Sequence, residues 1–153
     1  KGLERLDVRE FEAITGRGDG SEVWVGSNAE GLVSILDPAS GEVDSPLSGF
    51  QWPYRILIVE EKGLVVIPDL RQEVVRFVDL QARTDIQTLE VPGHGPQGVA
   101  LTGDGQTLFL SLSRSDQVAV IDLDSLEIIR YIAVGPTPDG IGWSPVVIER
   151  GRG

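Results

Sequence analysis

Short apolar segments recur along this chain at a nearly constant interval, and each of them ends in an aspartate. Residues 32–37 read LVSILD, residues 74–79 read VVRFVD and residues 117–122 read QVAVID. The three terminal aspartates are spaced by 42 and 43 residues, and prolines at positions 53, 96 and 138 keep the same spacing. Several independent markers therefore share one period, which indicates a small structural unit stacked several times.

Within one repeat, four β-rich segments are separated by turn signals. The third repeat has them at residues 98–101, 107–110, 118–121 and 128–134. Asp104 and Gly105 stand between the first two segments, and an Asp-Gly pair favours a tight hairpin turn. The segments are too short and too rich in β-branched residues for helices. A period of 42 or 43 residues predicts one four-stranded β-propeller blade per repeat and an all-β chain.

The repeats predict an arc of three complete blades with partial strands at both ends, in one domain that spans residues 1–153. The complete blades are expected at about residues 10–52, 53–92 and 96–135. In the flanking parts, 1–9 and 136–153, we expect an outermost strand over residues 3–8 and a further inner strand that begins at Gly140. Asp37, Asp79 and Asp122 are expected to accept amide hydrogen bonds in turns.

The third repeat resembles the YVTN-type β-propeller repeat. Residues 96–111 read PQGVALTGDGQTLFLS and residues 118–122 read VAVID, which is similar to the pattern P-x-G-x-A-x-(S/T)-x-D-G followed by a strand and V-x-V-I-D. The pattern returns at residues 138–141, PDGI, whereas residues 10–12 and 53–55 depart from its opening Pro-x-Gly. The resemblance implies a propeller, of which this chain is a partial length. It also implies a periplasmic or extracellular location.

An open arc of blades leaves an apolar face exposed at each end, and propellers normally close a ring of about 4–8 blades. Two copies related by a two-fold axis would close a ring of six or eight blades, depending on whether the partial strands build a blade or only cap one. The alternative is that the chain is one half of a longer propeller. We expect self-association.

Acidic residues outnumber basic ones by 24 to 13 among the 153 residues, which gives a formal net charge of −11. Such a surface repels phosphate backbones and anionic lipid, so neither nucleic acid nor membrane insertion is expected. Cysteine is absent and there is one histidine, which excludes thiolate sites and sites built from several imidazoles of one chain. We expect no metal site and no cofactor.

Residues in the loops that a propeller presents on one face are the candidates for function. For catalysis, the candidates are His94, Asp69 and Asp139. For a ligand-binding face, they are Trp52, Tyr54, Arg55, Arg71, Gln97, Arg114 and Asp116.

Each candidate also has a simpler structural interpretation. His94 is either a general base or metal ligand near the axis or a loop residue in a turn shaped by Gly and Pro. The pairs Asp69–Arg71 and Arg114–Asp116 either orient a polar ligand or form exposed ion pairs. Trp52 either anchors an interface or covers the edge of the core.

The sequence contains no Gly-x-Ser-x-Gly elbow and no phosphate-binding loop. The first hypothesis is therefore a non-enzymatic binding module that presents a propeller face to a protein or a small ligand. A lactonase-like or other hydrolytic enzyme with a site on the central face is the alternative, and a docking subunit of a redox enzyme is a third. These two follow from the resemblance, because YVTN-type propellers include lactonase-like enzymes, surface-layer proteins and redox-enzyme subunits.

Overall fold

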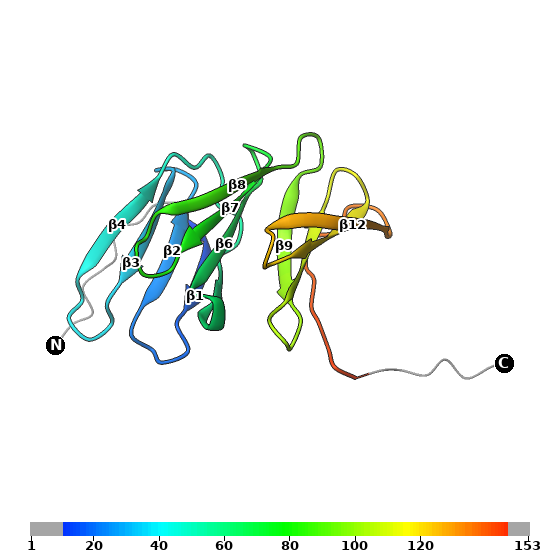
Figure 1. Cartoon of the computed structure of the whole chain (residues 1–153). Coiled ribbons are helices and arrows are strands. Elements are labelled where there is room, and N and C mark those ends of the chain that lie inside the picture. Colours follow the sequence, from blue (N-terminus) through cyan, green and yellow to red (C-terminus); the bar gives the residue numbers. More distant parts are fainter. Residues whose placement is uncertain (1–10, 147–153) are drawn as a thin grey trace.

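The computed structural model describes residues 11–146 and is an arc of three four-stranded antiparallel sheets (Figure 1). The first blade comprises β1 (Phe11–Gly16), β2 (Val23–Ser27), β3 (Leu32–Leu36) and β4 (Val43–Ser48). The second comprises β5 (Leu57–Val59), β6 (Leu64–Asp69), β7 (Val74–Asp79) and β8 (Asp85–Glu90), with a 3-10 turn, η1 (Glu60–Lys62), after β5. The third comprises β9 (Pro96–Leu101), β10 (Thr107–Leu112), β11 (Gln117–Asp122) and β12 (Glu127–Ala133). The predicted all-β propeller arc is confirmed.

Each sheet is a meander in which every strand pairs with its neighbours in sequence, so β1, β5 and β9 are edge strands. Strand β1 contacts β5 and strand β9 contacts β6, which places these edges on the inner side of the arc. Among the described residues, no helix has both the length and the apolar character needed to span a bilayer. The outermost strand expected over residues 3–8 lies outside the described residues.

The repeated aspartates act as the sequence predicts. Asp37 accepts hydrogen bonds from the backbone N–H groups of Ala39 and Ser40 at 2.7 and 3.2 Å, and Asp79 and Asp122 each accept two amides of the following turn in the same way. The amide of Ala39 is the largest cause that holds the pKa of Asp37 below its ordinary value. Each aspartate thus fixes the turn between the two outer strands of its blade.

Two apolar layers hold the blades together, and strand β6 contributes to both. Its side chains alternate, so that Val65 and Ile67 pack in the layer between the first two blades, while Leu64 and Val66 pack in the layer between the second and third. All four are buried. A strand that is covered on both faces reads as a continuous apolar run, which is why residues 64–67 lack the polar alternation of an exposed strand.

The structure corrects one expectation at the C-terminal end. Residues 136–146 contain no strand, although an inner strand was expected from Gly140. In the part of the chain that the structure describes, no strand pairs with these residues. The segment instead lies against the third blade: Ser111 Oγ donates to the Asp139 carbonyl oxygen at 2.6 Å, and the Trp143 ring covers Gly103 so closely that a Cβ there would be 2.8 Å from it.

Exposed apolar side chains gather at the two ends of the arc. Phe11 and Ile14 on β1 are 59% and 64% exposed. At the other end, the exposed apolar residues of β12 and the segment after it are Ile129, Tyr131, Ile132, Val134, Trp143 and Val146. A cavity of about 290 Å³ lies there between Phe109, Val118 and residues 141–144. The end faces of the arc are therefore more apolar than an ordinary exposed surface.

Candidate functional site

Most of the candidate residues lie on one edge of the three sheets. We call this edge the upper face: the loops 49–56, 70–73, 91–95 and 113–116 and the segment 134–139. The loops that connect β4 to β5, β8 to β9 and β10 to β11 run along the top of Figure 1. Asp69 ends β6 and Gln97 lies near the start of β9, so both border this face. The structure thus brings the sequence candidates to one side of the arc.

Trp52 is held between a carboxylate and a guanidinium. Its indole Nε1 donates a hydrogen bond to Glu12 on β1. The guanidinium carbon of Arg71 lies 4.5 Å from the Trp52 ring centroid, a cation–π geometry. The Tyr54 ring is 6.3 Å away from the Trp52 ring and tilted by 42°. Trp52 is half-buried, so part of its surface remains open to a partner.

Tyr54 repeats this arrangement with different partners. Its hydroxyl donates to the Asp139 carboxylate, at 3.1 and 3.2 Å from the two oxygens. The guanidinium carbon of Arg55 lies 4.6 Å from the Tyr54 ring centroid, and Arg55 also donates to the Tyr54 carbonyl oxygen at 2.9 Å. Burial, and after it the hydrogen bond to Asp139, raises the pKa of the Tyr54 hydroxyl above its ordinary value.

These six residues form what we call the axial cluster: Glu12, Trp52, Tyr54, Arg55, Arg71 and Asp139. Tyr54 and Asp139 follow Pro53 and Pro138, so they hold the same position in repeats two blades apart. Equivalent positions of blades that are not neighbours touch only where the blades converge. The contact between Tyr54 and Asp139 therefore places the cluster at the inner ends of the blades, around the axis of the arc.

Asp69 is a structural residue in this arrangement. Its side chain is buried, and its carboxylate accepts four backbone N–H groups, from Gln51, Trp52, Arg71 and Gln72, at 2.7 to 3.1 Å. A carboxylate with this many donors has little capacity left for a substrate. Asp69 joins the loop that carries Trp52 to the loop that carries Arg71, and so positions these two residues of the axial cluster.

The two ion pairs considered from the sequence are not formed in the described part of the chain. Arg71 lies over Trp52 instead of pairing with Asp69. Arg114 pairs with Glu73 of the second blade, because the carboxylate of Asp116 is turned toward the backbone N–H of Thr137, which donates to it at 2.9 Å. Both arginines thus connect loops of different elements.

His94 has a partner that the sequence did not indicate. Its Nδ1 lies 2.8 Å from Ser115 Oγ, and its ring stacks on Tyr131 with centroids 5.6 Å apart and planes at 16°. The described residues contain no group of three His, Asp or Glu side chains that could hold a metal ion. The chemistry that this part of the upper face offers is therefore a hydroxyl next to an imidazole.

Sequence reasoning missed Glu12, Glu73 and Ser115. Glu12 stands where the repeat pattern has glycine, Glu73 lies outside the positions that the pattern marks, and Ser115 belongs to a polar loop with no motif of its own. One signal was available for Glu73: residues 73 and 116 are 43 apart, so it occupies the same repeat position as Asp116. An acidic residue at both positions indicates that its carboxylate accepts a hydrogen bond there, as Glu73 does from the Gly93 N–H and Asp116 does from the Thr137 N–H.

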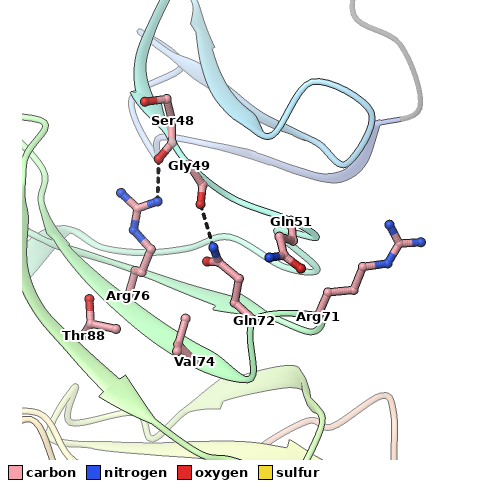
Figure 2. A pocket seen from close by; sticks show the side chains of 8 residues that line it. All are labelled: Ser48, Gly49, Gln51, Arg71, Gln72, Val74, Arg76 and Thr88. Atoms are coloured by element: carbon pink, nitrogen blue, oxygen red, sulfur yellow. Dashed lines mark hydrogen bonds between the residues drawn. The ribbon is translucent and has the colours of Figure 1, made fainter.

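A polar groove of about 660 Å³ lies beside the cluster, between the first two blades. Figure 2 shows its lining residues, Ser48, Gly49, Gln51, Arg71, Gln72, Val74, Arg76 and Thr88. Arg76 donates to the Ser48 carbonyl oxygen at 2.8 Å and pairs with Asp85 at 2.7 Å. Gln72 donates to the Gly49 carbonyl oxygen at 2.8 Å. These groups brace the blades, whereas the Arg71 side chain extends away from the groove in Figure 2.

No known protein-family profile matches the sequence, and no curated protein matches it. Among solved structures, a hydrazine synthase of Kuenenia stuttgartiensis superposes with a TM-score of 0.82 at 22% identity, over 94% of this chain and 42% of that chain. A streptogramin B lyase superposes with a TM-score of 0.72 at 16% identity, over 92% and 47% of the two chains.

A third structure, a catalytically inactive virginiamycin B lyase from Staphylococcus aureus with quinupristin, has a TM-score of 0.70 at 16% identity and covers 88% of this chain and 46% of that chain. At these identities the likeness shows the propeller fold alone. The chain spans less than half the length of each of these structures. Proteins of similar fold thus include enzymes.

The raised pKa of Tyr54 predicts a pH dependence of stability. Ionisation of a tyrosine in the unfolded chain occurs near pH 10, whereas the folded protein resists it. The stabilisation is therefore complete below about pH 10 and is lost as the pH rises through the folded pKa. In a Tyr131→Phe background, Tyr54 is the one remaining tyrosine, and tyrosinate absorbance measures its midpoint directly.

We expect this midpoint to lie above that of the same variant in denaturant, and to fall when Asp139→Asn removes the charge beside the hydroxyl. Glu127→Gln, on the exposed strand β12, is the control and should leave it unchanged. Equal midpoints in the folded and denatured chain would contradict the geometry around Tyr54.

Proposed function

We propose that this chain is a non-enzymatic binding module that presents its upper face to a ligand. The axial cluster supports this most directly: two aromatic rings and four charged groups from separate elements meet where the blades converge. Aromatic rings next to arginine are the residue types that dominate recognition surfaces. The half-buried Trp52 ring provides an apolar contact area for the ligand, and the surrounding charged side chains orient the ligand.

The hydrogen bonds of the carboxyl groups agree with a binding role. Asp69 is occupied by four backbone amides, and Asp139 accepts the Tyr54 hydroxyl. Both groups hold the cluster in place. Asp69, which already accepts four donors, therefore has no lone pair left for a general base, whereas Asp139 is exposed and keeps acceptor capacity for a ligand.

Hydrolysis is the second candidate function, and the contact between Ser115 Oγ and His94 Nδ1 at 2.8 Å favours it. This is the distance expected between a nucleophile and its base. The fold similarity to virginiamycin B and streptogramin B lyases adds support for an enzyme. The likeness to a hydrazine synthase supports the third alternative, a docking part of a redox enzyme.

We also propose that a second copy of the chain covers the ends of the arc. In each apolar layer, one face of a blade packs on the opposite face of the next. The third blade leaves Phe109 and Ile132 for a following blade, and the first leaves Phe11 and Ile14 for a preceding one. One end thus exposes the face that packs on a following blade, and the other end exposes the face that packs on a preceding blade. Two copies related by a two-fold axis can therefore join head to tail at both junctions.

Removal of the Trp52 ring tests the binding role. Ligand-observed NMR screening of a soluble fragment library should yield hits whose affinity falls about tenfold or more in Trp52→Ala, as for an interface anchor. Ile86→Ala, which removes an exposed apolar side chain of strand β8 away from the upper face and from both ends of the arc, is the control and should keep them. Turnover of esters or lactones that survives Trp52→Ala but disappears in both Ser115→Ala and His94→Ala would favour hydrolysis instead.

Light scattering coupled to gel filtration tests the second copy. We expect twice the mass of one chain, and a shift to the monomer in Ile14→Lys, because this change places a charge in the apolar junction. Ile86→Lys is the matched control, since Ile86 on β8 is similarly exposed, at 54%, but lies away from both ends. A monomeric wild-type chain at high concentration would refute closure by a second copy.

A further inference from the structure

The axial cluster holds two positive and two negative charges that do not neutralise each other directly. Glu12 contacts the edge of the Trp52 ring, and Arg71 lies over the face of the same ring. Asp139 contacts the hydroxyl of Tyr54, and Arg55 lies over that ring. Each aromatic ring therefore separates one carboxylate from one guanidinium.

This separation is unusual within the described part of the chain. Arg17, Lys62, Arg76, Arg83 and Arg114 each form an ion pair with a carboxylate. Arg55 and Arg71 form none there, although the chain has 24 acidic residues for 13 basic ones; Arg130 also forms none, but it lies on the exposed strand β12. Both arginines of the axial cluster thus lack a carboxylate partner in an acidic protein, and they keep donors available for a ligand.

The carboxylates also keep acceptor capacity. Glu12 is exposed and receives the indole N–H, and Asp139 is exposed and receives the Tyr54 hydroxyl. An ionised carboxylate offers about four acceptor sites, so both can accept further hydrogen bonds. Three of the charged groups act on the same side chain, because Asp139, Arg55 and Glu12 each influence the pKa of Tyr54.

We propose that the axial cluster binds a short peptide through its free ammonium and carboxylate ends. This inference rests on the binding role proposed above. The carboxylate of the peptide bonds Arg55 or Arg71, and its ammonium bonds Glu12 or Asp139. A ligand with one charge is attracted by one pair and repelled by the other, whereas a zwitterion gains charge-assisted hydrogen bonds at both ends. The rings of Trp52 and Tyr54 contact the chain between the ends.

The test compares three probes by isothermal titration calorimetry on the intact 153-residue chain: triglycine, N-acetyl-triglycine and triglycine amide. Blocking either end should weaken binding about tenfold, since a hydrogen bond to a charged group contributes about 1.5–3 kcal/mol and 1.4 kcal/mol is tenfold in affinity. Arg71→Gln should weaken triglycine but leave the amide nearly unchanged. Glu12→Gln should weaken triglycine but leave the acetylated peptide nearly unchanged.

Two controls lie on the exposed strand β12, Arg130→Gln and Glu127→Gln, and both should bind all three probes as the wild type does. Amide NMR spectra verify that each variant is folded. Equal affinities for the blocked and unblocked peptides would overturn the peptide proposal. The peptide proposal would also be overturned if triglycine did not bind at millimolar concentration. This holds even if other ligands bind and their binding requires Trp52. If no ligand depends on Trp52, the binding role itself fails.

Discussion

The apolar faces of neighbouring blades pack on each other, and this stacking holds the arc together. Strand β6 shows the stacking most clearly, because Val65 and Ile67 face one layer while Leu64 and Val66 face the other. Burial of such side chains contributes about 1.5–3 kcal/mol each, so the second blade is stabilised by both neighbours. The outer two blades keep one exposed end face each, where Ile14 and Ile132 lie.

The same packing that stacks the blades also brings their inner ends together. Loops that enter the innermost strands are forced toward a common axis, and this convergence lets Tyr54 meet Asp139 across 85 positions of sequence. Asp69 adds the local restraint, since it ties the Trp52 loop to the Arg71 loop through backbone amides. The stacking of the blades thus brings the loops of the axial cluster together. The aromatic and charged side chains of the cluster take no part in the apolar layers between the blades.

The architecture was predictable because it depends on features that repeat. Asp37, Asp79 and Asp122 each cap the same turn, and their spacing alone gives the size of a blade. The prediction of an inner strand from Gly140 was wrong, because a strand forms only beside another strand. Among the described residues no strand pairs with this segment, and the local sequence pattern does not show whether one does. The site was partly predictable: the loop positions of Trp52, Tyr54 and Arg55 follow from the repeat.

The partners of these residues were not predictable. Glu12 reaches Trp52, Glu73 reaches Arg114 and Ser115 reaches His94 across 40, 41 and 21 positions of sequence. Such contacts depend on the distance between loops in the folded chain, which the repeat pattern alone does not give. The arrangement of the candidate site therefore depends on contacts between loops, whereas the fold depends on the repeat itself.

Double-mutant cycles across strand β6 test the central claim, that neighbouring residues of one strand serve opposite layers. Val66 and Leu110 belong to the same layer, whereas Ile67 belongs to the other. Chemical denaturation of the alanine variants should give a coupling of about 0.5–3 kcal/mol for Val66→Ala with Leu110→Ala, and additivity within about 0.5 kcal/mol for Ile67→Ala with Leu110→Ala. Equal coupling in both cycles, or coupling in the second alone, would contradict the stacked arrangement.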